Sequence, residues 1–257
     1  MNRPVLFIHD AWLTTAIWEH FKSRFAACGY TCIVPPWHAP RPPAEGMPPA
    51  TRPAILGIAQ LIDHYASIAE GLPAAPLLVG HGFGGLVVQM LLDRGLGSAG
   101  IAIAPVPPRG VRRDILAFAL LPLLLKGGLH ELQVEMTFAH FAARVAQYLS
   151  PQEQYAAYRR YCVAIPRRIL YQAVLGIDSG VDFANDQRAP LLLIAGKNDR
   201  VIRASLVVSI YHHHHRSIAP TSYKCFAGRS HWLIAEPNWE EVADYSIEWS
   251  QAQSGRF

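Results

Sequence analysis

A glycine-rich turn in the first half of the chain carries the clearest chemical signal in the sequence. It reads Gly80-His81-Gly82-Phe83-Gly84, after a short apolar run and before an amphipathic helical pattern. A strand, a sharp turn and a helix are the setting of the nucleophile elbow, G-x-S-x-G, whose central side chain attacks an electrophilic carbon. Gly82 stands at that central position, so the attacking oxygen is missing.

The glycines of this turn have steric reasons. Gly80 and Gly84 flank the point where strand and helix would cross so closely that a Cβ would clash. The central position of an elbow has φ > 0, which costs a non-glycine residue on the order of 1–3 kcal/mol. Gly82 adopts that conformation without strain. We therefore expect the elbow backbone to persist, with φ > 0 at Gly82.

Around this turn, short apolar runs alternate with helical patterns. Continuous apolarity within a run indicates burial on both faces, so the alternation predicts an α/β fold with a parallel sheet and right-handed crossovers. The expected strands are Pro4–His9, Thr31–Pro35, Leu77–Gly80, Ile101–Pro105, Leu191–Gly196 and Ser222–Phe226. The expected helices are Ile17–Ala27, Ile55–Leu72, Gly84–Asp93 and Trp239–Gln251, and the proline-rich stretch Pro35–Pro53 is expected to be a loop.

Residues 106–188 interrupt this alternation because they contain helical patterns and no strand-like run. The sequence therefore predicts a helical cap inserted between two core segments, residues 1–105 and 189–257. The cap should cover the carboxyl edge of the sheet, where open α/β sheets bind their ligands. Its expected helices are Asp114–Leu125, His130–Leu149, Gln152–Val163 and Arg168–Gly176.

On the elbow and this alternation, the chain resembles the α/β-hydrolase superfamily over essentially its full length. It is most similar to small-cap bacterial hydrolases with a GHSFGG-type elbow. The resemblance implies a mostly parallel sheet of about six strands. It also places the catalytic acid at Asp199, in LLLIAGKNDRVI, and the catalytic histidine at His231, in FAGRSHWLIAEPNW. The order elbow, acid, histidine is that of the family.

The same resemblance implies a geometry for these residues. We expect His231 Nδ1 within hydrogen-bond reach of Asp199, with Nε2 facing the space beside Gly82. The alternative is structural: Asp199 would cap the following helix and His231 would be an ordinary loop histidine. His81, next to Gly82 in the elbow, is expected to pack there without a catalytic role.

A second implied feature is the oxyanion hole, the pair of backbone amides that holds a developing negative charge. The turn His9-Asp10-Ala11-Trp12 resembles the family's His-Gly-x-Trp turn, so the amides of Ala11 and Phe83 should point at a substrate oxygen. Asp10 replaces the family's glycine, and a carboxylate there could disfavour an oxyanion. His9 is expected to hold this turn by hydrogen bonding.

Three functional interpretations follow from Gly82. The chain is a small-ester or carbonyl hydrolase inactivated by substitution, an enzyme in which His231 and Asp199 act directly on a water or a substrate proton, or a non-catalytic protein that binds a small ligand. A membrane-associated lipase is less favoured. If the hydrolase geometry is retained, Gly82→Ser should rebuild a catalytic triad.

The composition and a few sequence patterns limit the kinds of molecule that the chain is expected to bind. The 257 residues include 23 Lys or Arg and 19 Asp or Glu, giving a net charge of +4, and no basic stripe suggests nucleic acid. The start lacks a signal-peptide pattern, the apolar run Ile115–Leu125 is too short to span a membrane, and the four cysteines have no zinc spacing. We predict a cytoplasmic protein with a small-molecule substrate or ligand, no cofactor and no metal. The tract His212–His215 is expected to be a solvated helix end, and no pattern specifies an oligomeric state.

Overall fold

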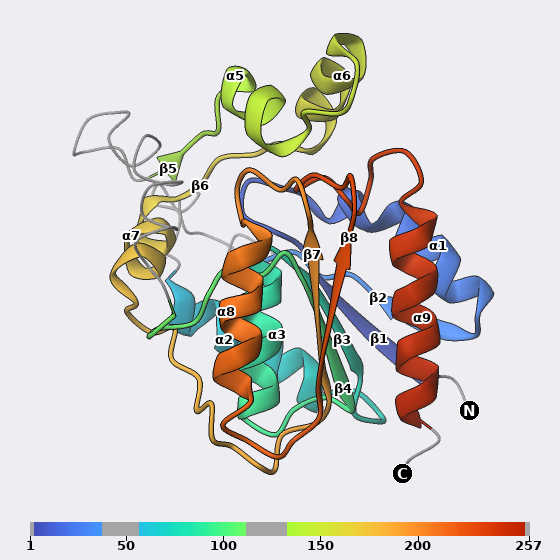
Figure 1. Ribbon diagram of the computed structural model, residues 1–257, viewed down its shortest axis with the longest axis vertical. Helices are drawn as coiled ribbons and strands as arrows, with labels where there is room; N and C mark the ends of the chain where they lie inside the picture. Colours follow the sequence, from blue (N-terminus) through green and yellow to red (C-terminus); the bar gives the residue numbers. More distant parts are fainter. Residues whose placement is uncertain (1–2, 38–56, 112–132, 255–257) are drawn as a thin grey trace, which may run out of the picture.

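A computed structural model describes residues 3–37, 57–111 and 133–254 (Figure 1). The expected helix Asp114–Leu125 and most of the proline-rich stretch lie outside these ranges. Among the described helices, none has the length and apolar character needed to cross a membrane.

Six parallel strands form the central sheet, in the order β2-β1-β3-β4-β7-β8. All six predicted strands are present: Leu191–Gly196 has the predicted bounds, and the other five are shifted at one or both ends. The inner strands are almost wholly buried, which explains their continuous apolar sequence. The strands are β1 (Arg3–Ile8), β2 (Tyr30–Ile33), β3 (Leu77–His81), β4 (Ala99–Ile103), β7 (Leu191–Gly196) and β8 (Thr221–Phe226).

Helices cover both faces of this sheet (Figure 1). On one side lie η1 (Thr15–Trp18), α1 (Glu19–Ala27) and α9 (Glu240–Ser254), and on the other lie α2 (Ile58–Glu70), α3 (Phe83–Asp93) and α8 (Ala204–His214).

The histidine tract His212–His215 lies at the end of α8, and the prediction that this end is solvated is wrong for His214. This residue is 1% exposed, its Nε2 lies 3.1 Å from Gln89 Oε1, and burial lowers its pKa to about 3.

The described cap segment lies over the carboxyl edge of the sheet, at the top of Figure 1. It contains β5 (Gln133–Val134), α5 (Phe138–His140), η2 (Phe141–Val145), α6 (Pro151–Tyr161), β6 (Ile165–Pro166) and α7 (Arg167–Leu175). The expected helix His130–Leu149 is wrong as a single element, because Val134 pairs with Ile165 in a two-stranded antiparallel ladder. This tertiary pairing outweighs the local helical pattern. The domain boundaries at 106 and 188 stay a prediction.

Strand register brings the chemical residues together. In the β1–β3 ladder, Ile8 lies opposite Gly80, so the residues two positions farther on, Asp10 and Gly82, leave the sheet side by side. In the β7–β8 ladder, Gly196 lies opposite Phe226, and the loops that follow carry the acid and the histidine. Four loops therefore meet at one edge of the sheet.

Candidate active site

The elbow has the geometry that its glycines predict. Gly82 has φ 55° and ψ −115°, and it directly precedes α3. A Cβ on Gly80 would lie 2.1 Å from the carbonyl oxygen of Gly84, and a Cβ on Gly84 would lie 2.0 Å from that of Ile8. Real Cβ atoms do not approach backbone so closely, so this crossing of strand and helix requires both flanking glycines.

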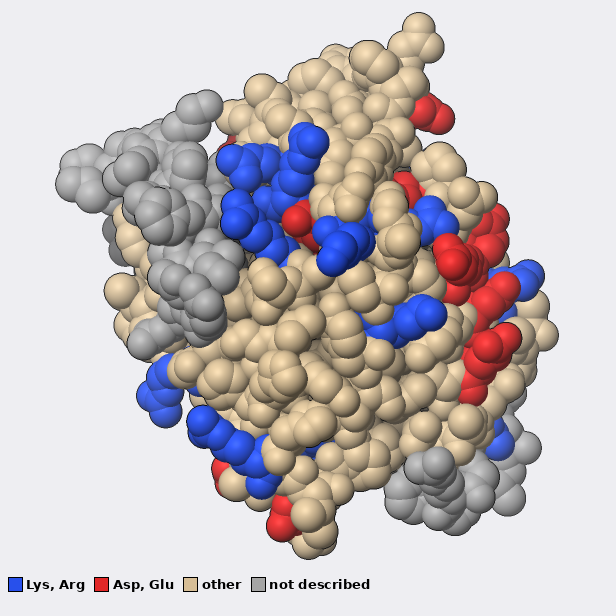
Figure 2. Space-filling model, in the orientation of Figure 1, with Lys and Arg blue, Asp and Glu red and all other residues tan. Residues whose placement is uncertain are grey.

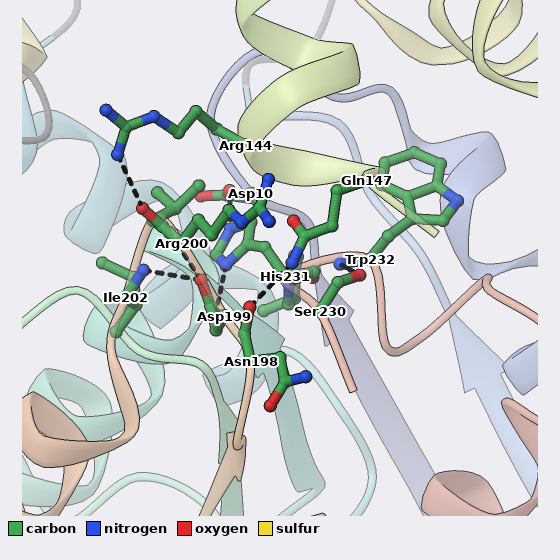
Figure 3. A network of polar contacts seen from close by, with 12 residues as sticks. Asp10, Arg144, Gln147, Asn198, Asp199, Arg200, Ile202, Ser230, His231 and Trp232 are labelled. Atoms are coloured by element: carbon green, nitrogen blue, oxygen red, sulfur yellow. Dashed lines mark hydrogen bonds and ion pairs between the residues drawn. The ribbon is translucent and has the colours of Figure 1, made fainter. Parts of the chain in front are cut away.

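The acid and the histidine form a buried pair at the ends of β7 and β8 (Figure 3). His231 Nδ1 donates to Asp199 Oδ2 across 2.7 Å, and the two side chains are 2% and 0% exposed. Asp199 Oδ1 accepts from the amides of Val201 at 2.7 Å and Ile202 at 2.8 Å. Asp199 therefore orders its own loop and also orients His231, and the two interpretations of this residue are compatible.

The loop that carries the histidine is held by Ser230 and Glu236, which the sequence did not single out, and by His81 of the elbow. The Ser230 hydroxyl and amide both donate to the carboxylate of Glu236, and Ser230 Oγ accepts from the amide of Trp232. His81 Nε2 donates to the carbonyl of His231 across 2.9 Å. Glu236 is 2% exposed, and burial raises its pKa although the bonds from Ser230 oppose that shift. In the sequence it directly follows the apolar run Trp232–Ala235, with no motif to mark it.

The turn after β1 is fixed from several sides. His9 Nδ1 donates to the carbonyl of Asp10, and the His9 ring stacks on Trp37, whose Nε1 donates to the His9 carbonyl. Trp12 has φ 60°, a left-handed conformation that costs a non-glycine residue about 1–3 kcal/mol. Its Nε1 donates to the carbonyl of Val134 in the cap segment across 3.0 Å. The turn therefore contains one strained residue, and contacts with Trp37 and with Val134 of the cap segment hold it in place.

Asp10 turns its carboxylate into the oxyanion hole. Oδ1 accepts from the amide of Ala11 at 2.7 Å and from the amide of Phe83 at 2.6 Å. The expectation that these amides point at a substrate oxygen is therefore wrong for this structure. The physical reason is that a carboxylate within reach satisfies two backbone donors at once, the amide of Phe83 at the start of α3 and the amide of Ala11 in the turn after β1.

The second oxygen of Asp10 faces the histidine. His231 Nε2 lies 3.2 Å from Asp10 Oδ2, so the imidazole is held between two carboxylates. Burial disfavours the charged ring, but the charge of Asp199 and hydrogen bonds to both acids raise the pKa of His231 to about 10. Burial also opposes ionisation of Asp10, yet its bond with His231 and the surrounding groups lower its pKa overall. At neutral pH the site holds an imidazolium between two carboxylates.

Asp10 also occupies the space of the missing side chain. A Cβ built on Gly82 would lie 2.0 Å from Asp10 Oδ1, 2.1 Å from Cγ and 2.4 Å from Oδ2. The expectation that Gly82→Ser would rebuild a triad is therefore wrong as long as Asp10 keeps this position. Besides its positive φ, Gly82 leaves room for a carboxylate that arrives from the neighbouring strand.

Two cavities lie near this centre. One of about 20 Å³ touches Asp10, Gly82 and His231, and it is otherwise lined by Trp12, Phe83, Val106, Val201 and Ile202. That volume holds about one water molecule. The other, of about 360 Å³, lies on the outer side of the Asp199 loop and carries the basic side chains Arg144, Lys197, Arg200 and Arg203. Figure 2 shows basic side chains gathered where the cap segment meets the core.

Three of the site residues have atoms that could ligate a metal. Asp10, His81 and His231 are the one such group in the part of the chain that the structure describes, with donor atoms within 4.8 Å of one another. Hydrogen bonds already use both oxygens of Asp10, Nε2 of His81 and both ring nitrogens of His231. Only His81 Nδ1 has no partner among these atoms. The present arrangement is satisfied as an ion-paired network.

Comparison with known proteins identifies the family. A family model described as "Alpha/beta hydrolase family" matches residues 5–245, almost the whole chain. The chain belongs to the α/β-hydrolase family. The elbow, the acid loop and the histidine loop of this hydrolase-fold chain all fall within the matched range. A search of curated proteins found no match to the sequence.

Solved structures similar to this α/β-hydrolase chain support the same fold. Polyneuridine aldehyde esterase is 13% identical with a TM-score of 0.72, covering 97% of this chain and 100% of its own. Tomato methylketone synthase I, complexed with 2-tridecanone, is 14% identical with a TM-score of 0.71, covering 98% and 99%. A monoacylglycerol lipase from Paleococcus ferrophilus is 17% identical with a TM-score of 0.66, covering 97% and 94%. At these identities the likeness concerns the fold alone.

Proposed function

We propose that this chain is a hydrolase of small, uncharged molecules that works without a serine nucleophile. His231 is the acid–base group, and Asp199 orients it. The observation that carries the proposal is the buried, doubly paired imidazole beside a water-sized cavity. General acid–base catalysis by a positioned side chain contributes roughly 10²–10⁴-fold to a rate.

The electrostatics define the order of proton transfers. His231 is protonated at rest because its pKa is about 10, so it first donates a proton to a leaving group. The neutral ring then accepts a proton from a water in the small cavity. Trp12, Phe83, Val106, Val201 and Ile202 make that cavity mostly apolar, which favours an uncharged substrate.

The filled oxyanion hole bears on the substrate class. Ester hydrolysis places negative charge on a carbonyl oxygen, and in these enzymes two backbone amides stabilise that charge. Here Asp10 Oδ1 accepts both bonds and adds a negative charge of its own. A small ester, the substrate class expected from the sequence, is therefore less suited to this site than an electrophile that does not need the hole.

A second candidate function is non-catalytic binding of a small ligand. It is favoured by the same observation, since Asp10 occupies the hole much as a bound carboxylic acid product would. In that case the pairing of His231 with Asp10 and Asp199 is purely structural. The two candidates differ in whether any substrate is turned over.

The test is a hydrolysis screen of the purified protein with small esters, lactones, epoxides and alkyl halides. We expect turnover of at least one class, and a loss of about 10²–10⁴-fold in His231→Gln and Asp199→Asn. His213→Gln is the matched control, because His213 lies on α8 and bonds only to the carbonyl of Ser209. Binding without turnover across the whole screen would establish the second candidate instead.

A further inference from the structure

The position of Asp10 suggests more than a filled space. Its carboxylate stands where the side chain of an elbow nucleophile would begin, within 2.4 Å of a Cβ on Gly82. It reaches this place from the loop after β1, because Ile8 and Gly80 are paired and both strands end at the same edge. A nucleophilic group is thus present at the elbow, although the elbow residue does not supply it.

The two oxygens of this carboxylate have different environments. Oδ1 is fixed by the amides of Ala11 and Phe83, at 2.7 Å and 2.6 Å. Oδ2 has one partner, His231 Nε2, at the long distance of 3.2 Å, and the side chain is 13% exposed beside the small cavity. Oδ1 is therefore held by two short bonds, whereas Oδ2, with one long bond, is the oxygen that can move toward a substrate.

We propose, building on the function proposed above, that Asp10 is the covalent nucleophile of this hydrolase and that its substrates are small apolar molecules with a leaving group on a saturated carbon, such as epoxides and alkyl halides. Attack at an acyl carbon would need an oxyanion hole for the substrate, and Asp10 Oδ1 already fills it. Displacement at a saturated carbon creates no carbonyl oxyanion. It needs a carboxylate aligned with the bond that breaks and, for an epoxide, a proton for the ring oxygen, which His231 beside Asp10 can donate.

The covalent cycle balances in two steps. Asp10 Oδ2 forms a bond to the substrate carbon, and the leaving group departs with its electron pair, which gives an alkyl ester of Asp10. Water then attacks Cγ while His231 takes its proton, and negative charge develops on Oδ1, where the Ala11 and Phe83 amides already lie. Collapse breaks the Cγ–Oδ2 bond, the departing alkoxide takes the proton that His231 accepted and leaves as the alcohol, and the new carboxyl group of Asp10 loses its proton to solvent. The sum is hydrolysis, with no oxidation or reduction.

Alkylation also changes the state of the histidine. The resting imidazolium is stabilised by Asp199 and by the charge and hydrogen bond of Asp10. Esterification removes the negative charge of Asp10, so the imidazolium loses one of its two carboxylates. His231 then releases its proton more readily and can act as the base toward water in the cavity. The nucleophile and the base are thus activated in sequence.

The experiment uses 1-bromobutane and 1,2-epoxybutane with the full-length protein. We expect the wild type to release bromide or diol, and a single turnover in water enriched in heavy oxygen to place that isotope in the Asp10 carboxylate. With 1-bromobutane, whose bromide leaves without a proton, His231→Gln should stop after the first step and carry one alkyl group on the peptide that contains Asp10. Asp10→Ala should lose turnover by about 10³-fold or more, whereas the matched surface variant Asp63→Asn should not.

Each outcome has one meaning. Turnover of these probes with no heavy oxygen in Asp10 and no adduct in His231→Gln overturns the nucleophile assignment and leaves the proposed hydrolase standing. Hydrolysis of esters alone, unaffected by Asp10→Ala, also overturns it. Absence of turnover across the whole screen removes both proposals. The isotope measurement on the wild type is independent of whether any variant folds.

Discussion

The candidate site has two halves, a proposed acid–base half and a proposed nucleophile half, and they differ in which part of the chain supplies the side chains. In the acid–base half, Asp199 and His231 lie in the loops where the family order places them, and they bond across 2.7 Å. In the nucleophile half, the elbow keeps its backbone but not its side chain, and Asp10 from the neighbouring strand occupies the space. The difference teaches that the sheet edge defines places for functional groups, and that more than one loop can reach the same place.

The largest expected effect comes from the acid–base half. Asp199→Asn keeps the shape of the side chain but removes the charge that favours the imidazolium and fixes the ring orientation. We expect any hydrolytic activity to fall by about 10⁴-fold. The measurement is kcat/KM on the best substrate of the screen, compared with the surface variant Asp244→Asn. Equal activity in wild type and Asp199→Asn would separate His231 from catalysis.

The nucleophile half can be tested by placing a side chain at residue 82, where it competes with Asp10 for the same space, and by measuring the stability of the variant. Gly82→Ser alone places its Cβ against the Asp10 carboxylate, so we expect a destabilisation of several kcal/mol, beyond the roughly 1–3 kcal/mol of backbone strain. Gly95→Ser is the matched control, because Gly95 also has a positive φ, of 77°, and a Cβ there meets nothing within 4 Å. Urea unfolding of both variants gives the comparison.

The double variant Asp10→Gly with Gly82→Ser tests directly whether the Asp10 carboxylate is what excludes a side chain at residue 82. Removing the carboxylate empties the oxyanion hole and leaves room for the serine hydroxyl beside His231. We expect much of the stability lost in Gly82→Ser to return, a strongly non-additive result. The double variant should also react with a serine-directed phosphonate at residue 82, which neither single variant does. Additive destabilisation would mean that Asp10 is not what excludes a side chain at the elbow.

A pH titration compares the two carboxylates through the histidine between them. The folded pKa of His231 is about 10, above its usual 6.5, so the ion pairs contribute stability that is fully present below about pH 6.5 and is lost as the pH rises toward 10. We expect the free energy of unfolding to fall over this range more steeply in the wild type than in His231→Gln. Asp10→Asn should complete its loss at lower pH than wild type. Parallel curves for wild type and His231→Gln would contradict the raised pKa.

The smallest expected effect concerns the loop that carries the histidine. Ser230→Ala removes a hydroxyl that donates to the buried Glu236 and accepts from the amide of Trp232. Leaving these groups unpaired costs about 1–3 kcal/mol of stability. Ser23→Ala, on the exposed face of α1, is the matched control. A thermal shift no larger than that of the control would show that Glu236 finds another partner.

Much of this arrangement could be predicted from local sequence. The alternation of apolar runs and helical patterns gave the six strands, and the glycines of the elbow gave the positive φ of Gly82. The strands and the positive φ follow from short stretches of chain, in which steric limits and hydrophobic burial act on neighbouring residues. The pairing of His231 with Asp199, 32 residues apart, was implied by the family resemblance.

The rest depends on contacts between distant segments. The direction of Asp10 follows from the β1–β3 register and from two amides, one of them on α3. Val134, expected in a helix, instead pairs with Ile165 in a short antiparallel ladder. Glu236 supports the histidine loop because the fold buries it against the amide and hydroxyl of Ser230. None of these is visible in a window of a few residues.

The pairing of Ile8 with Gly80 has a consequence for reading related sequences. The pairing brings residues 10 and 82 to the same space beside the histidine. That space admits a side chain from one of the two positions but not from both. Glycine at the elbow is then not by itself a mark of lost function. Under the proposed mechanism the two positions are informative only together. An acid two residues after the first strand with a glycine at the elbow indicates that the nucleophile comes from the first loop, whereas glycine at both positions indicates that no nucleophile is present.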